Sequence, residues 1–387
     1  MTSSSVTDGQ RVVWIDWMRV AACFMVMVVH STEPFYLGGE GSLIQSSSDA
    51  VWVSFFDSFV RSCVPLFVVA SSFLLFPVSV PTGAFFRRRL IRILIPFLLW
   101  TVVYALVWGS PAENFRNLVL NFNYAAGHLW FVYMILGLYL IMPLLSPWAE
   151  RVGKRELRFY IGVWLFTNLI PLIRSMLVGA DVPTVYGPSG IPNPAVYPLW
   201  GEASWNAYGT FYYISGFIGY LLLGLYMRRF CGVPSLRQLL TIALPCWLVG
   251  FAICFGGFLR RVFADVAASA SGSFPFNGDV KFAAIWETTW INDTIGVALM
   301  AIGWIMLFRR MHSCGAFFRR VLLPVSKASY SMYLCHMIVL CVFSAWFRSS
   351  LQLSTPLAIL ATAVCTFVTA ALISLALRAI PRVGRYF

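Results

Sequence analysis

Residues 13–33 read VWIDWMRVAACFMVMVVHSTE, an apolar run interrupted by only a few ionisable side chains. A helix needs about twenty apolar residues to cross a bilayer core of roughly 30 Å. Lipid offers no hydrogen-bond partner to the backbone of an open strand, so a spanning run of this kind is helical. We therefore predict that this stretch is a membrane-spanning helix.

The rest of the chain repeats this pattern. Hydrophobic residues make up 59% of the 387 residues and charged residues only 11%, against about half and a quarter in soluble globular proteins. A soluble protein is therefore excluded, and we predict an all-α membrane protein. We expect a bundle of about ten transmembrane helices in a single membrane domain over residues 1–387, with no soluble domain. The predicted spans are 13–33, 51–77, 90–108, 127–147, 159–177, 207–227, 238–258, 283–308, 322–346 and 356–378.

The charge of the chain is strongly positive, with 28 Lys and Arg residues against 15 Asp and Glu residues. These basic residues form short clusters between the apolar runs, which is typical of membrane orientation and not of nucleic-acid binding. If the spans alternate in direction, most clusters fall on one side. This predicts that both termini, with short tails at 1–12 and 379–387, are cytoplasmic. The loops 178–206 and 259–282 then face outward. We expect the lipid bilayer as a partner, and no nucleic acid.

Ionisable residues inside the predicted spans are the candidates for function, because each costs about 2.5–3.5 kcal/mol at the centre of a membrane. By the predicted topology most of them lie in the outer half, which favours a cavity shared by several helices. These residues are Asp16, Arg19, His30, Glu33, Asp57, Arg61, His128, Glu287, Asp293 and His336. The nine cysteines form no C-x-x-C pair and are interpreted as buried hydrophobic residues, so no metal site is predicted.

The first span carries the clearest arrangement of such residues. Arg19 and His30 are eleven residues apart, nearly three helical turns, so both side chains lie on one face, about 16 Å apart along the axis. Glu33 follows three residues later and can reach the His30 ring. Pro34 disfavours helix at Glu33, which predicts the end of the helix there. By the alternative interpretation, Arg19 extends to the headgroups and His30 is an interfacial residue.

Five short motifs follow one another along the chain. The first is the pair Arg19 and His30, preceded by Asp16. The others are VPLFVVASSFL at 64–74, RLIRILIP at 89–96, HLWFVY at 128–133 and SMYLCH at 331–336. In this order and spacing they resemble the acyltransferase 3 family of integral-membrane acyltransferases. The chain has Ser72 where that family usually has glycine; a small residue is retained, so close helix packing is still expected.

The resemblance implies an O-acetyltransferase type of activity in the cell envelope, at the bacterial inner (plasma) membrane. An acyl group, usually acetyl, would move from cytoplasmic acyl-CoA to a hydroxyl of an extracytoplasmic or lipid-linked glycan. Acyl-CoA would be a substrate, with no permanently bound cofactor. His30 would act as general base, because a histidine pKa lies near neutrality. Glu33 would orient its ring, and Arg61, Arg19 or His128 would stabilise the oxyanion.

The donor is expected to bind at the arginines of the third span. Arginine forks bind phosphate oxygens in pairs, and Arg88, Arg89 and Arg92 are spaced so that at least one pair shares a helix face. By itself this cluster is also an ordinary determinant of membrane topology, and the family motif favours the donor site at Arg89 and Arg92. The further candidates for the site are Asp57, Asp293 and His336.

Two other functions fit the same composition. A proton-coupled transporter would use Asp293, His336 and Arg61 to relay protons, although no internal repeat of the kind found in transporters is detectable. A glycolipid-binding or assembly protein without enzymatic activity is the third hypothesis. Binding of acetyl-CoA would distinguish these classes.

Overall fold

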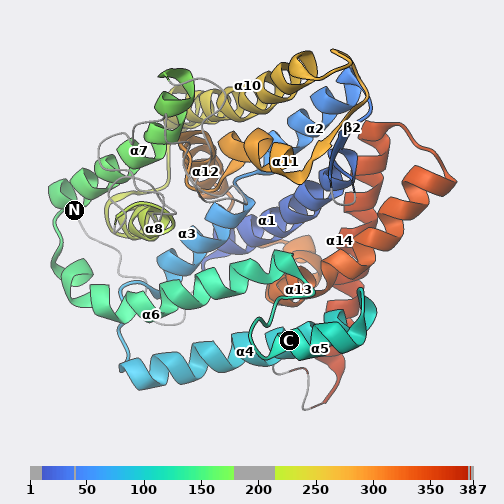
Figure 1. Cartoon of the computed structure of the whole chain (residues 1–387). Helices are drawn as coiled ribbons and strands as arrows, with labels where there is room; N and C mark the ends of the chain where they lie inside the picture. The colour runs from blue at the N-terminus through green and yellow to red at the C-terminus, as the bar shows by residue number, and fades with distance from the viewer. Residues whose placement is uncertain (1–10, 39–40, 178–213, 382–383, 385–387) are drawn as a thin grey trace.

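The computed structural model describes residues 11–38, 41–177, 214–381 and 384, and its elements are almost all helices (Figure 1). Within these residues, 8 helices are long and apolar enough to cross a membrane, or up to 9 with one bent pair. The prediction of an all-α membrane protein is confirmed. The predicted count of about ten is approximate, because the span expected at 207–227 begins outside the described residues. Only its later part, α8 (Ile218–Phe230), is described there.

The long helices follow the predicted spans closely. Several spans are built from consecutive helical segments that continue one another. The segments are α1 (Val13–Thr32), α2 (Ser47–Val60), α3 (Cys63–Leu75), α4 (Thr82–Val107), α6 (Trp130–Arg151), α7 (Lys154–Leu177), α9 (Leu236–Gln238), α10 (Leu244–Ala268), α12 (Ile295–Phe308), α13 (Leu323–Ala345) and α14 (Thr355–Ala379). Shorter elements join or extend them: η1 (Glu33–Phe35), α5 (Pro111–Leu118), η2 (Gly127–Leu129), η3 (Leu239–Ala243), α11 (Val280–Trp286), η4 (Glu287–Trp290), η5 (Phe318–Leu322) and η6 (Trp346–Ser350).

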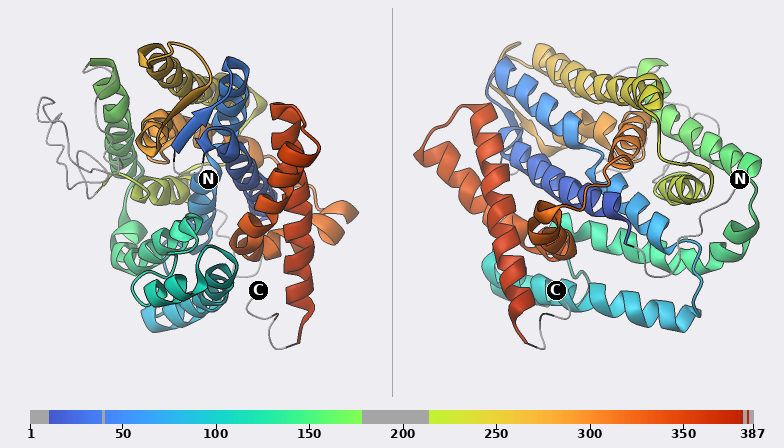
Figure 2. Two further views of the ribbon diagram at one scale, coloured as in Figure 1. Left: turned by 45° about the vertical axis from the view of Figure 1, so that its right-hand side comes forward. Right: turned by 180° about the vertical axis from the view of Figure 1, so that it is seen from behind.

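Helix α1 lies at the centre of the bundle. It packs against α13 and α14 along one side and against α2, α3 and α12 elsewhere (Figure 2). Its side chains from Met25 to Val29 are all buried. Because this helix contacts so many others, any side chain near its end meets residues from several parts of the chain.

A small sheet closes one end of the bundle, and the sequence does not predict it. Strand β2 (Gly41–Ile44) pairs antiparallel with β1 (Leu37–Gly38) and with β3 (Phe276–Asp279). The loop predicted at 259–282 is therefore partly wrong, because α10 continues to Ala268 and the loop then forms β3. The loop predicted at 178–206 lies outside the described residues.

Close packing around Ser72 accounts for the departure from the family motif. The Ser72 hydroxyl donates a hydrogen bond to the Leu221 carbonyl oxygen on α8, at 2.5 Å. A Cβ atom on Gly224, in the same helix, would lie 2.5 Å from the Ser72 hydroxyl. The glycine therefore makes room for the serine, so that the close contact between α3 and α8 is kept.

Candidate active site

His30 and Glu33 lie in contact where α1 ends. Pro34 is the second residue of η1, and the change from α-helix to the tighter η1 turn begins at Glu33. The Glu33 carboxylate lies 2.7 Å from Nδ1 of His30. A carboxylate only accepts hydrogen bonds, so the Nδ1 atom carries the proton and Nε2 of a neutral His30 is the free basic nitrogen. The structure thus brings together the two residues that the spacing predicts to meet.

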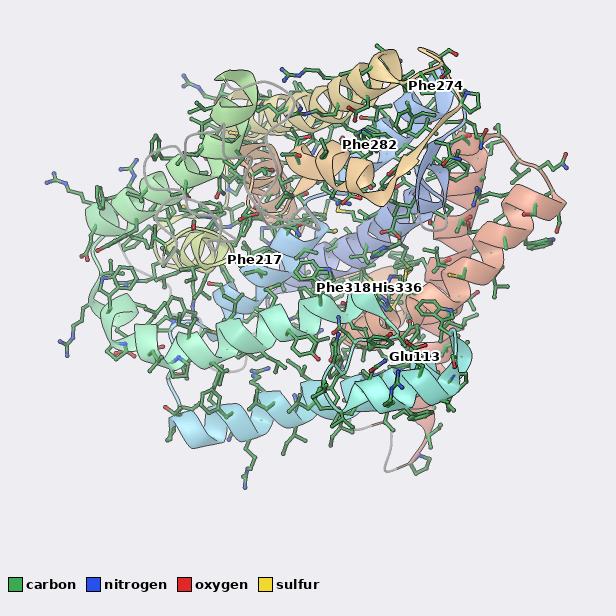
Figure 3. All side chains as sticks on the ribbon, viewed as in Figure 1. Glu113, Phe217, Phe274, Phe282, Phe318 and His336 are labelled. Atoms are coloured by element: carbon green, nitrogen blue, oxygen red, sulfur yellow. The ribbon has the colours of Figure 1, made fainter. Side chains whose placement is uncertain are left out.

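His30 belongs to a cluster of three histidines, His30, His128 and His336, which we call the histidine cluster. The ring centre of His336 lies 5.1 Å from that of His30 and 5.2 Å from that of His128. The His30 and His128 rings are 6.3 Å apart. Figure 3 labels His336 deep in the bundle, where α13 meets the ends of α1 and α6. Three predicted candidates from distant parts of the sequence are therefore neighbours.

Hydrogen bonds connect Tyr333 with both His336 and His128. Nδ1 of His336 lies 2.5 Å from the carbonyl oxygen of Tyr333, one turn earlier in α13. The Tyr333 hydroxyl donates to the backbone carbonyl of His128, at 2.5 Å. In contrast, the Nε2 atoms of both His128 and His336 are buried without a hydrogen-bond partner among the described residues. Buried polar atoms are nearly always paired in native proteins. Two unpaired nitrogens on neighbouring rings are therefore candidates for contact with a ligand or substrate.

A cavity of about 600 Å³ lies close to this cluster. Its wall carries five basic side chains and, among the described residues, no carboxylate. The lining residues are Arg11, Arg19, Val26, Val64, Phe67, Ser71, Arg92, Ile93, Phe131, Ile135, Tyr139, Ser326, Lys327, Ser329, Tyr330, Tyr333, Arg378 and Gly384. We call this space the cation-lined cavity.

The histidine cluster lies close to the cation-lined cavity, although its three residues are not among the described lining residues. On α1, Val26 lines the cavity and His30 follows one turn later; on α13, Tyr333 lines it and His336 follows one turn later. At the start of α6 the order is reversed, so that His128 lies three residues before the lining residue Phe131. One helical turn is about 5.4 Å. Each histidine is therefore about one turn from a residue of the cavity wall.

The basic residues of the wall lie on α1 and its approach and on α4, α13 and α14. Arg11 and Arg19 lie on the approach to and early part of α1, Lys327 near the start of α13, and Arg378 at the end of α14. The Arg378 guanidinium donates to the Lys327 carbonyl oxygen, at 3.1 Å. On α1 and α13 the basic residues therefore lie nearer the start of the helix, and the histidines lie further along it.

The sequence and this geometry agree with one family. The model of a family described as an acyltransferase domain matches residues 12–375, nearly the whole chain. The chain belongs to the acyltransferase 3 family. No curated protein and no solved structure matches it significantly. The resemblance found in the sequence is therefore confirmed, and the protein is a multi-pass membrane acyltransferase rather than a transporter or an assembly protein.

In this acyltransferase the arginines of α4 differ in position. Arg92 lines the cavity, whereas Arg88 and Arg89 are absent from its wall. Arg88 is exposed and Arg89 is half-buried. The structure therefore brings one of the three predicted donor-binding arginines to the cavity. It adds Arg11, Lys327 and Arg378, which the sequence left among the topology determinants.

Arg19 lies in the wall of the cavity and not beside the base. Its separation from His30 on α1, about 16 Å along the axis, places it nearer the start of the helix. Nearby, the Arg11 guanidinium contacts the Asp16 carboxylate at 2.6 Å. Ser326 of α13 donates to the same carboxylate, also at 2.6 Å. Asp16 thus holds the start of α1 against α13, and Arg19 belongs to the basic part of the cavity wall.

A second polar group, the Arg61 cluster, consists of Asp57, Arg61, Glu287 and Tyr36. The Arg61 guanidinium contacts Asp57 at 3.1 Å and Glu287 at 3.4 Å. Its Nε donates to the Trp290 carbonyl oxygen, at 3.0 Å. The Asp57 side chain is 0% exposed and that of Arg61 is 15% exposed. Arg61 therefore has partners on three sides, which favours a structural role over a role in oxyanion stabilisation.

The Arg61 cluster is attached to the end of α1. Thr32, two residues after His30, donates to the Asp57 carboxylate at 2.9 Å. The Tyr36 hydroxyl donates to Glu287 at 2.6 Å. Burial and the Glu287 carboxylate raise the pKa of Tyr36, so its hydroxyl keeps its proton and stays a donor. The sequence shows Glu287 as a carboxylate within a span but does not show its partners Tyr36 and Arg61. In the structure that span is bent by 42° between its two parts.

Asp293 follows Glu287 by six residues along the chain. It sits in the turn between η4 and α12. The neighbouring Asn292 carbonyl accepts a 2.5 Å hydrogen bond from the Tyr220 hydroxyl on α8. Asp293 is also absent from the wall of the cation-lined cavity. Within the described part of the chain, no three His, Cys, Asp or Glu side chains converge as metal ligands.

Proposed function

We propose that this acyltransferase moves an acetyl group from acyl-CoA, held in the cation-lined cavity, to a hydroxyl of an extracytoplasmic or lipid-linked glycan. The observation that carries the proposal is the cavity itself, which is lined by five basic residues and has the histidine cluster about one helical turn beyond its wall. CoA has a matching polarity, with phosphates at one end and a thioester at the other. The acyl-CoA is a substrate and not a resident cofactor.

The basic residues suit the phosphates of the donor. Five cations from several helices, with no carboxylate among the described lining residues, make the cation-lined cavity attractive to anions. Arginine binds phosphate through paired donors, and lysine binds it as a point charge. Arg92, Lys327 and Arg378 lie on three different helices, so they can surround a phosphate group. The predicted topology places these residues toward the cytoplasm, where acyl-CoA is made.

His30 is the general base in this proposal. Its Nε2 atom is free while Nδ1 faces Glu33, and its side chain is 17% exposed whereas His336 is fully buried. A glycan hydroxyl is a poor nucleophile, and removal of its proton by a positioned histidine contributes about 10²–10⁴-fold in rate. Glu33 holds the ring and stabilises the imidazolium.

His128 is the better candidate for oxyanion stabilisation. Its Nε2 atom is buried without a partner among the described residues, whereas Arg61 is held by Asp57, Glu287 and a carbonyl. A preorganised donor in a buried place acts strongly on developing charge.

The acceptor approaches from the side of Glu33 and Glu287. These carboxylates are 27% and 28% exposed, and both lie beyond the histidine cluster as seen from the cavity. In a bacterial inner membrane this side would face the cell envelope, where glycans and lipid-linked sugars occur. Donor and acceptor would then meet at His30 from opposite sides.

Radiolabelled acetyl-CoA tests the proposal. Inside-out vesicles expose the cytoplasmic face, so the wild-type protein should bind the donor there and pass label to the glycan fraction inside. Vesicles with His30→Ala should bind acetyl-CoA and transfer no label. Wild-type vesicles that transfer no label to any glycan, or equal transfer by His30→Ala, would contradict the proposal.

A further inference from the structure

His336 has a buried nitrogen that the described part of the structure leaves unsatisfied. Its Nδ1 atom lies 2.5 Å from the Tyr333 carbonyl oxygen. A carbonyl only accepts, so Nδ1 carries the proton and Nε2 of the neutral ring is a bare acceptor. That Nε2 atom is buried and has no hydrogen-bond partner there. Because an unpaired buried acceptor is costly and rare, its retention calls for a role.

The position of the ring indicates which role. His336 lies 5.1 Å from His30, centre to centre. It also stacks on Tyr333, at 5.7 Å and 30°, and Tyr333 lines the cavity. His30 is turned toward Glu33 and the acceptor side. His336 therefore lies beside the base and stacks on a residue of the cavity wall, within reach of the space where the thioester sulfur would arrive.

We propose that His336 is a second catalytic residue, which carries the proton from His30 to the leaving sulfur of the acyl donor. This inference rests on the proposed function of the same site. As the acceptor oxygen attacks the thioester carbon, its proton moves to Nε2 of His30. The proton then passes to Nε2 of His336. When the carbon–sulfur bond breaks, the sulfur takes the electron pair and this proton, and free CoA thiol leaves. One ester forms, one thioester is consumed, and both rings return to neutrality.

The buried position explains why the sulfur needs a proton. A thiolate is disfavoured where water is excluded, because burial penalises the charged form of an ionisable group. A proton delivered before departure removes that charge. The division between two histidines also matches the two directions of approach, with a base on the acceptor side and an acid on the donor side.

His336→Asn tests the proton transfer with little change in shape. The asparagine amide can still donate to the Tyr333 carbonyl, but it cannot carry a proton. Transfer of label from acetyl-CoA should fall about 100-fold, within the range of lost acid–base catalysis, while acetyl-CoA affinity stays the same. Transfer from p-nitrophenyl acetate should change less than threefold, because its leaving anion departs without a proton. His30→Ala should slow both donors.

Thr366→Val is the matched control. The Thr366 hydroxyl is also buried without a partner among the described residues, it lies on α14, and it is absent from the cavity wall. Its substitution should leave transfer from both donors unchanged. An equal loss for both donors in His336→Asn, or no loss for acetyl-CoA, would overturn the role of His336 and leave the role of His30 intact. Absence of wild-type transfer from acetyl-CoA would instead overturn the proposed function.

A measurement on the wild-type protein covers the case in which His336 variants fail to fold. In heavy water the rate with acetyl-CoA should fall more than the rate with p-nitrophenyl acetate, because only the sulfur of CoA takes a proton from His336 as it leaves. Equal solvent isotope effects for the two donors would refute the relay.

Discussion

The cation-lined cavity and the Arg61 cluster both hold charge within an apolar bundle, but they hold it differently. In the Arg61 cluster a single guanidinium is matched by Asp57 and Glu287 and by a carbonyl oxygen. Five basic side chains line the cavity, and no carboxylate is among its described lining residues, although Arg11 is itself paired with Asp16. Two histidine nitrogens about one turn from the wall lack partners among the described residues. Charge matched within the protein holds helices together, whereas a surplus of cations around a cavity suits an anionic ligand.

The largest expected effect separates the two regions by activity. His30→Ala should lower the transfer rate about 10²–10⁴-fold through loss of the general base, with acetyl-CoA affinity and thermal stability close to those of the wild type. Glu33→Gln should lower the rate less, because a neutral amide still holds the ring without stabilising the imidazolium. Label transfer from acetyl-CoA and a thermal unfolding curve of the same preparation are the measurements. A smaller loss for His30→Ala than for Glu33→Gln would reverse the assignment of base and orienting group.

The Arg61 cluster should respond in stability. Asp57→Ala leaves the buried Arg61 short of a partner, which costs about 3–5 kcal/mol for a broken buried pair. The unfolding temperature in detergent should therefore fall clearly. Glu113→Ala is the control, because Glu113 is exposed on α5 and accepts a 2.9 Å hydrogen bond from the Tyr124 hydroxyl at the surface. Figure 3 labels this residue. If both variants unfold at the wild-type temperature, the Arg61 cluster is not the tie described above.

The cavity should respond in donor affinity. Arg92→Ala should weaken acetyl-CoA binding about tenfold, or ~1.4 kcal/mol, while the rate at saturating donor changes little, because phosphate contacts are the same in the ground and transition states. Arg92→Lys should rescue part of the loss. Arg88→Ala, on the same helix but outside the cavity wall, should bind normally. Equal weakening by both substitutions would return the α4 arginines to a general electrostatic role.

The smallest effect concerns the packing of α3 against α8. Ser72→Ala removes the hydrogen bond to the Leu221 carbonyl of α8, for a loss of about 1 kcal/mol in stability. Ser72→Val adds bulk against Gly224 and should cost more, because a close approach of the two helices is lost. Thermal unfolding of the two variants measures this order. A more stable Ser72→Val protein would show that the contact is not close in the membrane.

The site was predictable where its residues lie on one helix. Arg19, His30, Glu33 and Pro34 are close in sequence, so helical periodicity alone places His30 beside Glu33 and ends α1 there. The motif HLWFVY drew attention to His128, and SMYLCH to His336, but nothing in their spacing shows that these rings meet His30. Glu287 was noticed as a charge within a span without its partners, and Lys327 and Arg378 were indistinguishable from residues that set membrane orientation.

The sequence by itself determined that this protein is an all-helical membrane acyltransferase with a histidine–carboxylate pair at the end of its first span. The helical membrane fold depends on composition and on the length of the apolar runs, the pair on contacts within one helical turn, and the activity on the resemblance of five motifs to the acyltransferase 3 family. Only the tertiary structure decided which arginine of α4 reaches the cavity, that three histidines lie together beside it, and that Arg61 is held by partners. Those facts depend on how helices distant in the sequence pack around α1, because packing, not spacing along the chain, decides which side chains share a space.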